Sequence, residues 1–291
     1  MMKKIHGVLS APHQHWVGDG FPVRTLFSYQ DIVQYISPFL LLDYAGPHHF
    51  EPSPSPRGVG QHPHRGFETV TVVYEGEVAH RDSTGEGGVI GPGDVQWMTA
   101  ASGILHEEFH SPIFGRTGGS LRMVQLWVNL PAKAKAAPPR YQGITAAEIP
   151  SVELGQGARA RVIAGELTGV KGVAQTFTKM NLWDVRLEAG ASIAFDLPEG
   201  HNAAVAVLSG AIIANNDASA GEADVVILDR SGRDLLVDAL EDSILLVMTG
   251  EPIDEPIVGY GPFVMNTEAE IRQALADLRS GRFGRLAEPT V

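Results

Sequence analysis

Two pairs of side chains could do chemistry together, because the members of each pair lie two positions apart. His62 and His64 form the first pair, and His106 and Glu108 form the second. Side chains alternate between the two faces of an extended strand, so residues two apart point to the same side. Imidazole and carboxylate groups are common metal ligands. Each pair therefore supplies half of a candidate metal site.

Strand alternation also distinguishes between two adjacent carboxylates in the second pair's segment. If residues 103–108 are extended, Glu108 shares the face of His106 and Glu107 points the other way. Two such pairs facing each other across a β domain would place three ring nitrogens and one carboxylate around one ion. The sequence thus predicts a single metal ion held by the three histidines and Glu108.

The sequence allows two interpretations for each of two further residues, Glu68 and His80. Glu68 shares the parity of His62 and His64, so alternation alone does not exclude it as a ligand, and we interpret it as a residue that lines the site. His80 either faces the same cavity or is a core histidine with an ordinary hydrogen-bond partner.

Short strands separated by turns surround these residues. Segments 69–75, 95–100 and 121–130 are rich in β-branched and aromatic residues, and Gly- and Pro-containing turns at 82–88 and 91–94 lie between them. This rhythm predicts an all-β barrel or sandwich.

The stretch 131–139 is rich in Ala, Pro and Lys, and predicts a linker in which Lys133 and Lys135 are solvated. The domains expected are an N-terminal one over 1–135, a C-terminal one over 136–265, and a terminal helix and tail over 266–291.

The second half repeats the β rhythm without the ligands. If Gly210 is aligned with Gly76, Asp196 stands at the position of His62 and Pro198 at the position of His64. We therefore expect no metal site in the second domain.

The chain is expected to close with a helix. Thr267 and Glu270 fit a capping box, in which two side chains bond free backbone amides. Ile271, Leu275 and Leu278 form an apolar stripe. The helix is expected to cover a barrel or the seam between the domains.

Composition excludes several classes of function. The chain has 291 residues, 22 basic against 34 acidic side chains, a net charge of −12 and no cysteine. Direct nucleic-acid binding is not expected of so acidic a chain. Disulfides and thiolate ligands are excluded. No apolar run approaches the roughly 18 residues of a transmembrane helix, and the start lacks an apolar signal segment. A cytoplasmic protein fits best.

Several segments resemble one known family. His-Pro-His-Arg-Gly-Phe-Glu-Thr-Val at 62–70, Pro-Gly-Asp-Val-Gln-Trp-Met-Thr-Ala at 92–100 and Gly-Ile-Leu-His-Glu-Glu at 103–108 are similar to pirins, a family of the cupin superfamily. The closing segment 259–267 and the helix after it also resemble pirin C-termini. Residues 145–250 share only the β rhythm.

The resemblance implies a bicupin: two jelly-roll-like β-barrel domains in one chain, with one mononuclear metal, usually iron, in the N-terminal barrel. The family's ligands fall on His62, His64, His106 and Glu108, the set that alternation favours. Cupins in general would use Glu68 instead. Mn, Ni, Cu or Zn also suit histidine and carboxylate ligands.

The resemblance further implies either a quercetin 2,3-dioxygenase-like enzyme or a regulatory protein that binds a protein partner. For the enzyme, three imidazoles and one carboxylate leave two positions of an octahedral ion for a chelating flavonol and O₂, and Glu108 is a candidate base for the substrate hydroxyl. A metal- or redox-sensing regulator and a purely structural metal site are the alternatives. We predict the dioxygenase, with a small aromatic substrate, O₂, and neither nucleic acid nor membrane as partners.

Overall fold

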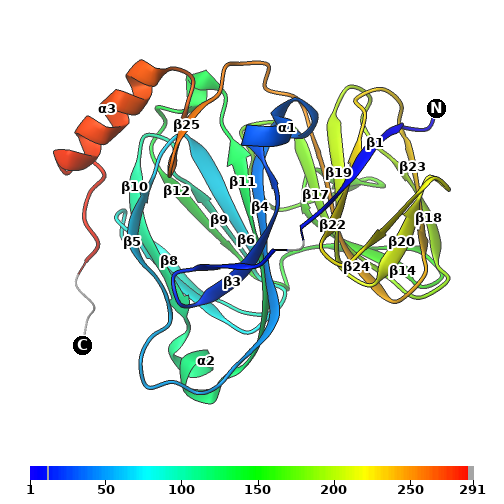
Figure 1. The fold of residues 1–291 in the computed structure, drawn as a ribbon, viewed down its shortest axis with the longest axis horizontal. Helices are drawn as coiled ribbons and strands as arrows, with labels where there is room; N and C mark the ends of the chain where they lie inside the picture. Colours follow the sequence, from blue (N-terminus) through cyan, green and yellow to red (C-terminus); the bar gives the residue numbers. More distant parts are fainter. Residues whose placement is uncertain (12, 288–291) are drawn as a thin grey trace. The chain divides into compact units, whose positions relative to one another are not determined.

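The structure, a computed structural model, describes residues 1–11 and 13–287 of the chain. Its elements divide into two compact, β-rich units (Figure 1). Unit 1 comprises Met1–His13, Arg24–Tyr44 and Ala147–Pro252, and unit 2 comprises Gln14–Val23, Ala45–Ala146 and Ile253–Val291.

Each unit is built from discontinuous stretches of chain, whereas the sequence predicts a division near residue 135. The start of the chain joins unit 1 because β1 (Ile5–Ser10) pairs antiparallel with β22 (Asp224–Leu228). The end of the chain joins unit 2. No helix in the described part of the chain is long and apolar enough to cross a bilayer.

Unit 2 contains a four-stranded sheet and most of a seven-stranded sheet. The smaller has the order β5 (Gly58–His64), β10 (Ile104–His110), β7 (Val78–Asp82) and β8 (Gly87–Ile90). The larger has the order β12 (Arg140–Ile144), β9 (Val95–Thr99), β6 (Phe67–Glu75), β11 (Gly119–Asn129), β4 (Phe39–Phe50), β3 (Phe21–Ser28) and β2 (His15–Val17). The β3 and β4 strands also contribute residues to unit 1.

Side chains from both sheets form the apolar core of unit 2. Val78 and Ile90 of the smaller sheet belong to the same buried cluster as Val73 and Met123 of the larger one. The sheets are separately hydrogen-bonded layers rather than one closed barrel. The predicted all-β architecture is confirmed.

Unit 1 repeats this arrangement. Its smaller sheet has the order β18 (Ser192–Asp196), β23 (Asp234–Ala239), β20 (Ala211–Ala214) and β21 (Ala218–Gly221). Its larger sheet has the order β1, β22, β19 (Asn202–Ser209), β24 (Ser243–Gly250), β17 (Met180–Leu187), β14 (Ala158–Ala164) and β13 (Ser151–Gly155). The strand orders of the two units therefore match position by position.

Short elements complete the fold. They are α1 (Tyr29–Ile36), α2 (Pro112–Thr117), the 3₁₀ turn η1 (Ala132–Ala134), and the two-stranded pairs β15 (Glu166–Leu167) with β16 (Val170–Lys171) and β25 (Val258–Tyr260) with β26 (Phe263–Met265).

Lys135 corrects the expectation of a solvated linker. It is buried, and its ammonium donates hydrogen bonds to Gly66 O at 2.7 Å, Asn129 Oδ1 at 2.7 Å and Val264 O at 2.8 Å. Burial lowers its pKa to about 7. Lys135 therefore binds this segment to unit 2 through hydrogen bonds that the local sequence does not predict.

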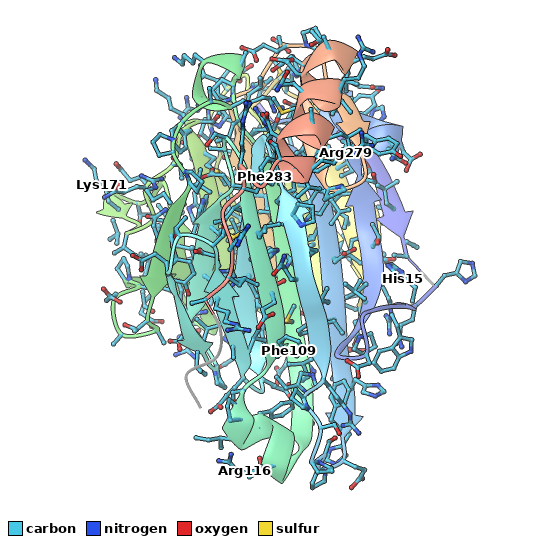
Figure 2. All side chains as sticks on the ribbon, turned by 90° about the vertical axis from the view of Figure 1, so that its left-hand side faces the viewer. His15, Phe109, Arg116, Lys171, Arg279 and Phe283 are labelled. Carbon is cyan, nitrogen blue, oxygen red and sulfur yellow. The ribbon has the colours of Figure 1, made fainter. Side chains whose placement is uncertain are left out.

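The C-terminal helix α3 (Glu268–Arg279) packs against the β25–β26 pair of unit 2 and lies next to one end of β10 (Figure 1). Ile271 and Ala274 share an apolar cluster with Leu105 of β10 and with Phe283, which lies directly beyond the Arg279 end of the helix (Figure 2). The predicted C-terminal helix is confirmed.

Thr267 caps α3, and its removal is expected to destabilise unit 2 modestly. Its hydroxyl accepts a hydrogen bond from Glu270 N at 3.2 Å, while the Glu270 carboxylate bonds Asn266 N at 3.1 Å. Thr267→Ala should lower the free energy of unfolding by about 1 kcal/mol, measured by urea denaturation. Thr267→Ser keeps the acceptor and should remain near wild type; equal losses in both variants would contradict the capping role.

Candidate metal centre

Three imidazoles meet where β5 and β10 pair. His62 lies opposite His106 in this antiparallel ladder, and His64 lies opposite Ile104. One ring nitrogen from each of His62, His64 and His106 lies within 4.8 Å of the other two. The structure therefore brings together the three histidines that the sequence singled out.

This group has ring nitrogens that are free to bind a metal ion. His64 Nδ1 and His106 Nε2 are buried and have no hydrogen-bond partner. His62 Nδ1 lies 2.9 Å from Gly60 O, so it carries the proton and leaves Nε2 as a lone-pair donor. Buried polar atoms are almost always satisfied, and an ion would satisfy these two.

The electrostatics of the group also suit a metal. Burial lowers the pKa of His64 well below its usual value, and neighbouring His62 lowers it further. Burial, followed by the neighbouring imidazoles, likewise lowers the pKa of His106. Both rings are therefore neutral near pH 7, the form that binds metal ions.

Glu108 takes the side predicted by alternation, but it lies with a different set of partners. It is buried and forms a second group with His80 and His106, whose candidate ligand atoms also lie within 4.8 Å of one another. The structure does not place its carboxylate in one group with His62 and His64. Glu107 points to the opposite face, where it forms an ion pair with Arg81.

Two amide side chains from the larger sheet hold Glu108. Gln125 Nε2 lies 3.0 Å from Glu108 Oε2, and Gln96 Nε2 lies 3.4 Å from Oε1. The indole of Trp127 lies 3.4 Å from Gln125 Oε1, which orients that amide with its nitrogen toward the carboxylate. Gln96, Gln125 and Trp127 were not identified from the sequence.

Glu68 lies in neither histidine group. Its carboxylate accepts a hydrogen bond from Thr99 Oγ1 at 2.6 Å, and it is 1% exposed. Burial raises the pKa of Glu68 to about 7, against the opposing effects of Thr99 and Trp97. In this structure Glu68 is therefore a buried residue fixed by Thr99 of β9 and lies outside both histidine groups.

The matching positions of unit 1 are apolar. The β20–β23 pair of unit 1 corresponds to the β7–β10 pair of unit 2. Val237 lies opposite Ala214 as Glu108 lies opposite His80. The counterparts of His80, His106 and Glu108 are therefore Ala214, Leu235 and Val237. Phe195 lies opposite Leu235 as His62 lies opposite His106, so the counterpart of His62 is Phe195 rather than Asp196. These counterparts all belong to the apolar core cluster of unit 1.

The ligand types narrow the choice of ion. Neutral imidazoles beside a carboxylate suit Fe, Ni, Cu or Zn, and two histidines with one carboxylate are typical of non-haem iron. The residues present therefore fit a divalent transition metal.

Two β units, one of them with a histidine-lined interior, define a two-domain cupin protein. Residues 20–128 match the pirin family, and residues 182–284 match the pirin C-terminal cupin domain. The chain belongs to the pirin family.

Similar proteins cover most of the chain. A Pseudomonas aeruginosa protein named "Putative quercetin 2,3-dioxygenase PA2418" is 59% identical over 285 residues, 98% of this chain and 99% of its own length. The crystal structure of a quercetin 2,3-dioxygenase from Acinetobacter baumannii has a TM-score of 0.96 and 54% identity, and covers 98% of this chain and 99% of its own. A bacterial pirin from Escherichia coli, YhhW in complex with nickel(II), shares the fold with a TM-score of 0.65 and 21% identity over 84% of this chain and 99% of its own.

Proposed function

We propose that unit 2 binds one divalent metal ion, with iron as the first choice, and that the protein is a dioxygenase acting on a flavonol such as quercetin. The observation that carries the proposal is the convergence of His62, His64 and His106, two of them with buried, unpartnered ring nitrogens. The names of the full-length relatives at 59% and 54% identity support the substrate class.

His62, His64 and His106 would hold the metal, and Glu108 is proposed as the fourth ligand. A bound divalent metal would lower the pKa of a coordinated hydroxyl and supply redox chemistry toward O₂. The protein's own contribution is to keep the His64 and His106 rings neutral by lowering their pKa values, and to keep water from the buried face, because His106 is fully buried.

The open edge of the site suits a flat aromatic molecule. His62, Gln125 and Trp127 are partly exposed, whereas His64, His106 and Glu108 are buried. The Trp127 ring stacks on Phe67 with centroids 4.3 Å apart, and its remaining surface offers an aromatic face to an incoming ring. A flavonol could thus stack at this edge with its oxygens toward the histidines.

Glu108 is proposed to accept the proton of the substrate hydroxyl. A carboxylate held by two amides is fixed in position, and a positioned base typically contributes about 10²–10⁴-fold. Glu108→Gln is therefore expected to lower the rate of flavonol consumption by about 10²-fold or more at equal metal content. The measurement is flavonol absorbance together with metal content per chain; full turnover in the metal-bound variant would remove Glu108 from this role.

Oxygen uptake with quercetin tests the proposed function as a whole. The purified protein should contain about one metal ion per chain and should consume O₂ and flavonol together. Bound metal with an unchanged flavonol spectrum under air would reject the dioxygenase and favour the regulatory alternative. Unfolding on removal of the metal would instead indicate a structural ion.

A further inference from the structure

A row of buried polar groups lies behind His106, on the side away from His62. In the β7–β10 ladder, His106 lies opposite Asp82 and Glu108 lies opposite His80. His80 Nε2 is 3.6 Å from Asp82 Oδ2, and His80 Nδ1 is 3.3 Å from His106 Nδ1. The side chains of His80 and Asp82 are completely buried.

The hydrogen-bonding capacities of these groups fix where the protons lie. A neutral imidazole has one N–H and one lone pair, and a carboxylate only accepts. His80 Nε2 and Asp82 Oδ2 face each other at 3.6 Å, and both are buried with no other hydrogen-bond partner, so a proton on His80 Nε2 is the arrangement that compensates both atoms. Nδ1 of His80 is then an acceptor. The amide nitrogen of Gln96, which only donates, lies 3.1 Å from the same Nδ1 and requires the same assignment.

The same logic extends to His106. Its Nδ1 faces the lone pair of His80, so Nδ1 carries the proton and Nε2 is left as the lone pair. This Nε2 is the buried nitrogen without a hydrogen-bond partner. The contacts of Asp82 with His80 and of His80 with His106 thus favour the tautomer in which His106 can bind a metal through Nε2.

Asp82 is itself held rigidly as a carboxylate. Its Oδ1 accepts hydrogen bonds from Thr84 N at 2.8 Å, Thr84 Oγ1 at 2.6 Å and Glu86 N at 3.3 Å. Burial raises its pKa, but the facing imidazole of His80 and the hydrogen bonds from Thr84 outweigh burial, so its pKa lies below the usual value. Oδ2 therefore remains directed at His80 as an acceptor.

We propose that Asp82 is a positioning residue that sets the tautomers of His80 and His106, so that His106 presents an unprotonated Nε2 to the metal. The proposal rests on the metal centre proposed above. His80 is then a hydrogen-bonded support of His106 rather than a ligand of a second ion, because its Nδ1 lies 3.1 Å from Gln96 Nε2 and 3.3 Å from His106 Nδ1.

Asp82→Asn tests the proposal because it replaces one carboxylate oxygen, which only accepts hydrogen bonds, with an amide nitrogen, which only donates them. The new amide keeps an oxygen for Thr84 and Glu86 but turns an N–H toward His80 Nε2. The tautomers of both histidines would then reverse as the Gln96 amide turns its unpartnered oxygen toward His80 Nδ1. In the metal-free protein, ¹⁵N spectra of the histidine rings should show His106 protonated on Nδ1 in wild type and on Nε2 in the variant. Affinity for Co(II), measured by chelator competition, should fall about 10- to 100-fold.

Thr84→Val is the matched control. It removes one hydrogen bond to Asp82 Oδ1 and leaves the contact between Oδ2 and His80, so tautomers and Co(II) affinity should stay at wild-type values. A wild-type His106 protonated on Nε2, or an Asp82→Asn variant with unchanged tautomers and affinity, would overturn the proposal. Failure of the wild type to bind Co(II) would reject the metal centre, while the ring spectra would still decide the role of Asp82.

Discussion

Replacing His106 with alanine is expected to eliminate metal binding. His106 is the one residue shared by both histidine groups, and its Nε2 is buried without another partner. Loss of an outer-shell partner already costs about 10- to 100-fold in metal affinity, so loss of this ligand should cost more than about 100-fold. Metal content per chain after dialysis against a weak chelator measures the effect, and O₂ uptake with quercetin should disappear with the metal.

His110→Ala is the matched control for this change. His110 lies on the same face of β10, is also buried, and hydrogen-bonds Gly20 O at 2.9 Å, but it belongs to neither histidine group. It should leave a similar cavity and retain metal. Full metal content in His106→Ala, or equal loss in both variants, would contradict the assigned role of His106.

Replacing Glu68 with glutamine is expected to change the pH dependence of stability. The folded-state pKa of Glu68 is about 7, above its ordinary value of 4.5, so the folded chain binds this proton more tightly than the unfolded chain does. Protonation of Glu68 therefore stabilises the folded chain fully below about pH 4.5, and this stabilisation is lost as the pH rises through about 7. Glu68→Gln keeps an oxygen for Thr99 and removes the buried charge.

The expected difference follows from the size of the pKa shift. At about pH 8 the Glu68→Gln variant should gain up to about 3 kcal/mol in free energy of unfolding relative to wild type, and near about pH 5 the gain should approach zero. Urea denaturation at both values measures it. Glu86→Gln, at an exposed position of unit 2, should show no such change. A pH-independent difference for Glu68→Gln would refute the raised pKa.

Local sequence patterns predicted the part of the site that lies on one sheet. His62, His64, His106 and Glu108 lie on two neighbouring strands, and alternation along a strand fixes the face of each side chain. The same spacing recurs in His80 and Asp82, so this pair could have been recognised in the same way.

The remaining residues of the site depend on how the facing sheet packs. Gln96 and Gln125 reach Glu108 from β9 and β11, and no sequence spacing indicates which residues of one sheet face those of the other. Glu108 shows the consequence: its face was predictable, but its partners in this structure were not. Lys135 is a similar case, because its three acceptors come from separate segments.

The division into units was predictable only in outline. The β rhythm and the absence of ligands in the second half were visible in the sequence. Long-range pairing of β1 with β22 was not, because pairing partners so far apart in the chain leave no local signal. The one-residue difference between Asp196 and Phe195 as counterpart of His62 has the same origin, since register is set by pairing.

Anomalous diffraction from crystals of the metal-loaded protein, recorded at the absorption edge of the bound metal, tests the central claim most directly. The account predicts one peak per chain, within coordinating distance of ring nitrogens of His62, His64 and His106. A peak among His80, His106 and Glu108 alone, a peak elsewhere, or no peak would contradict it.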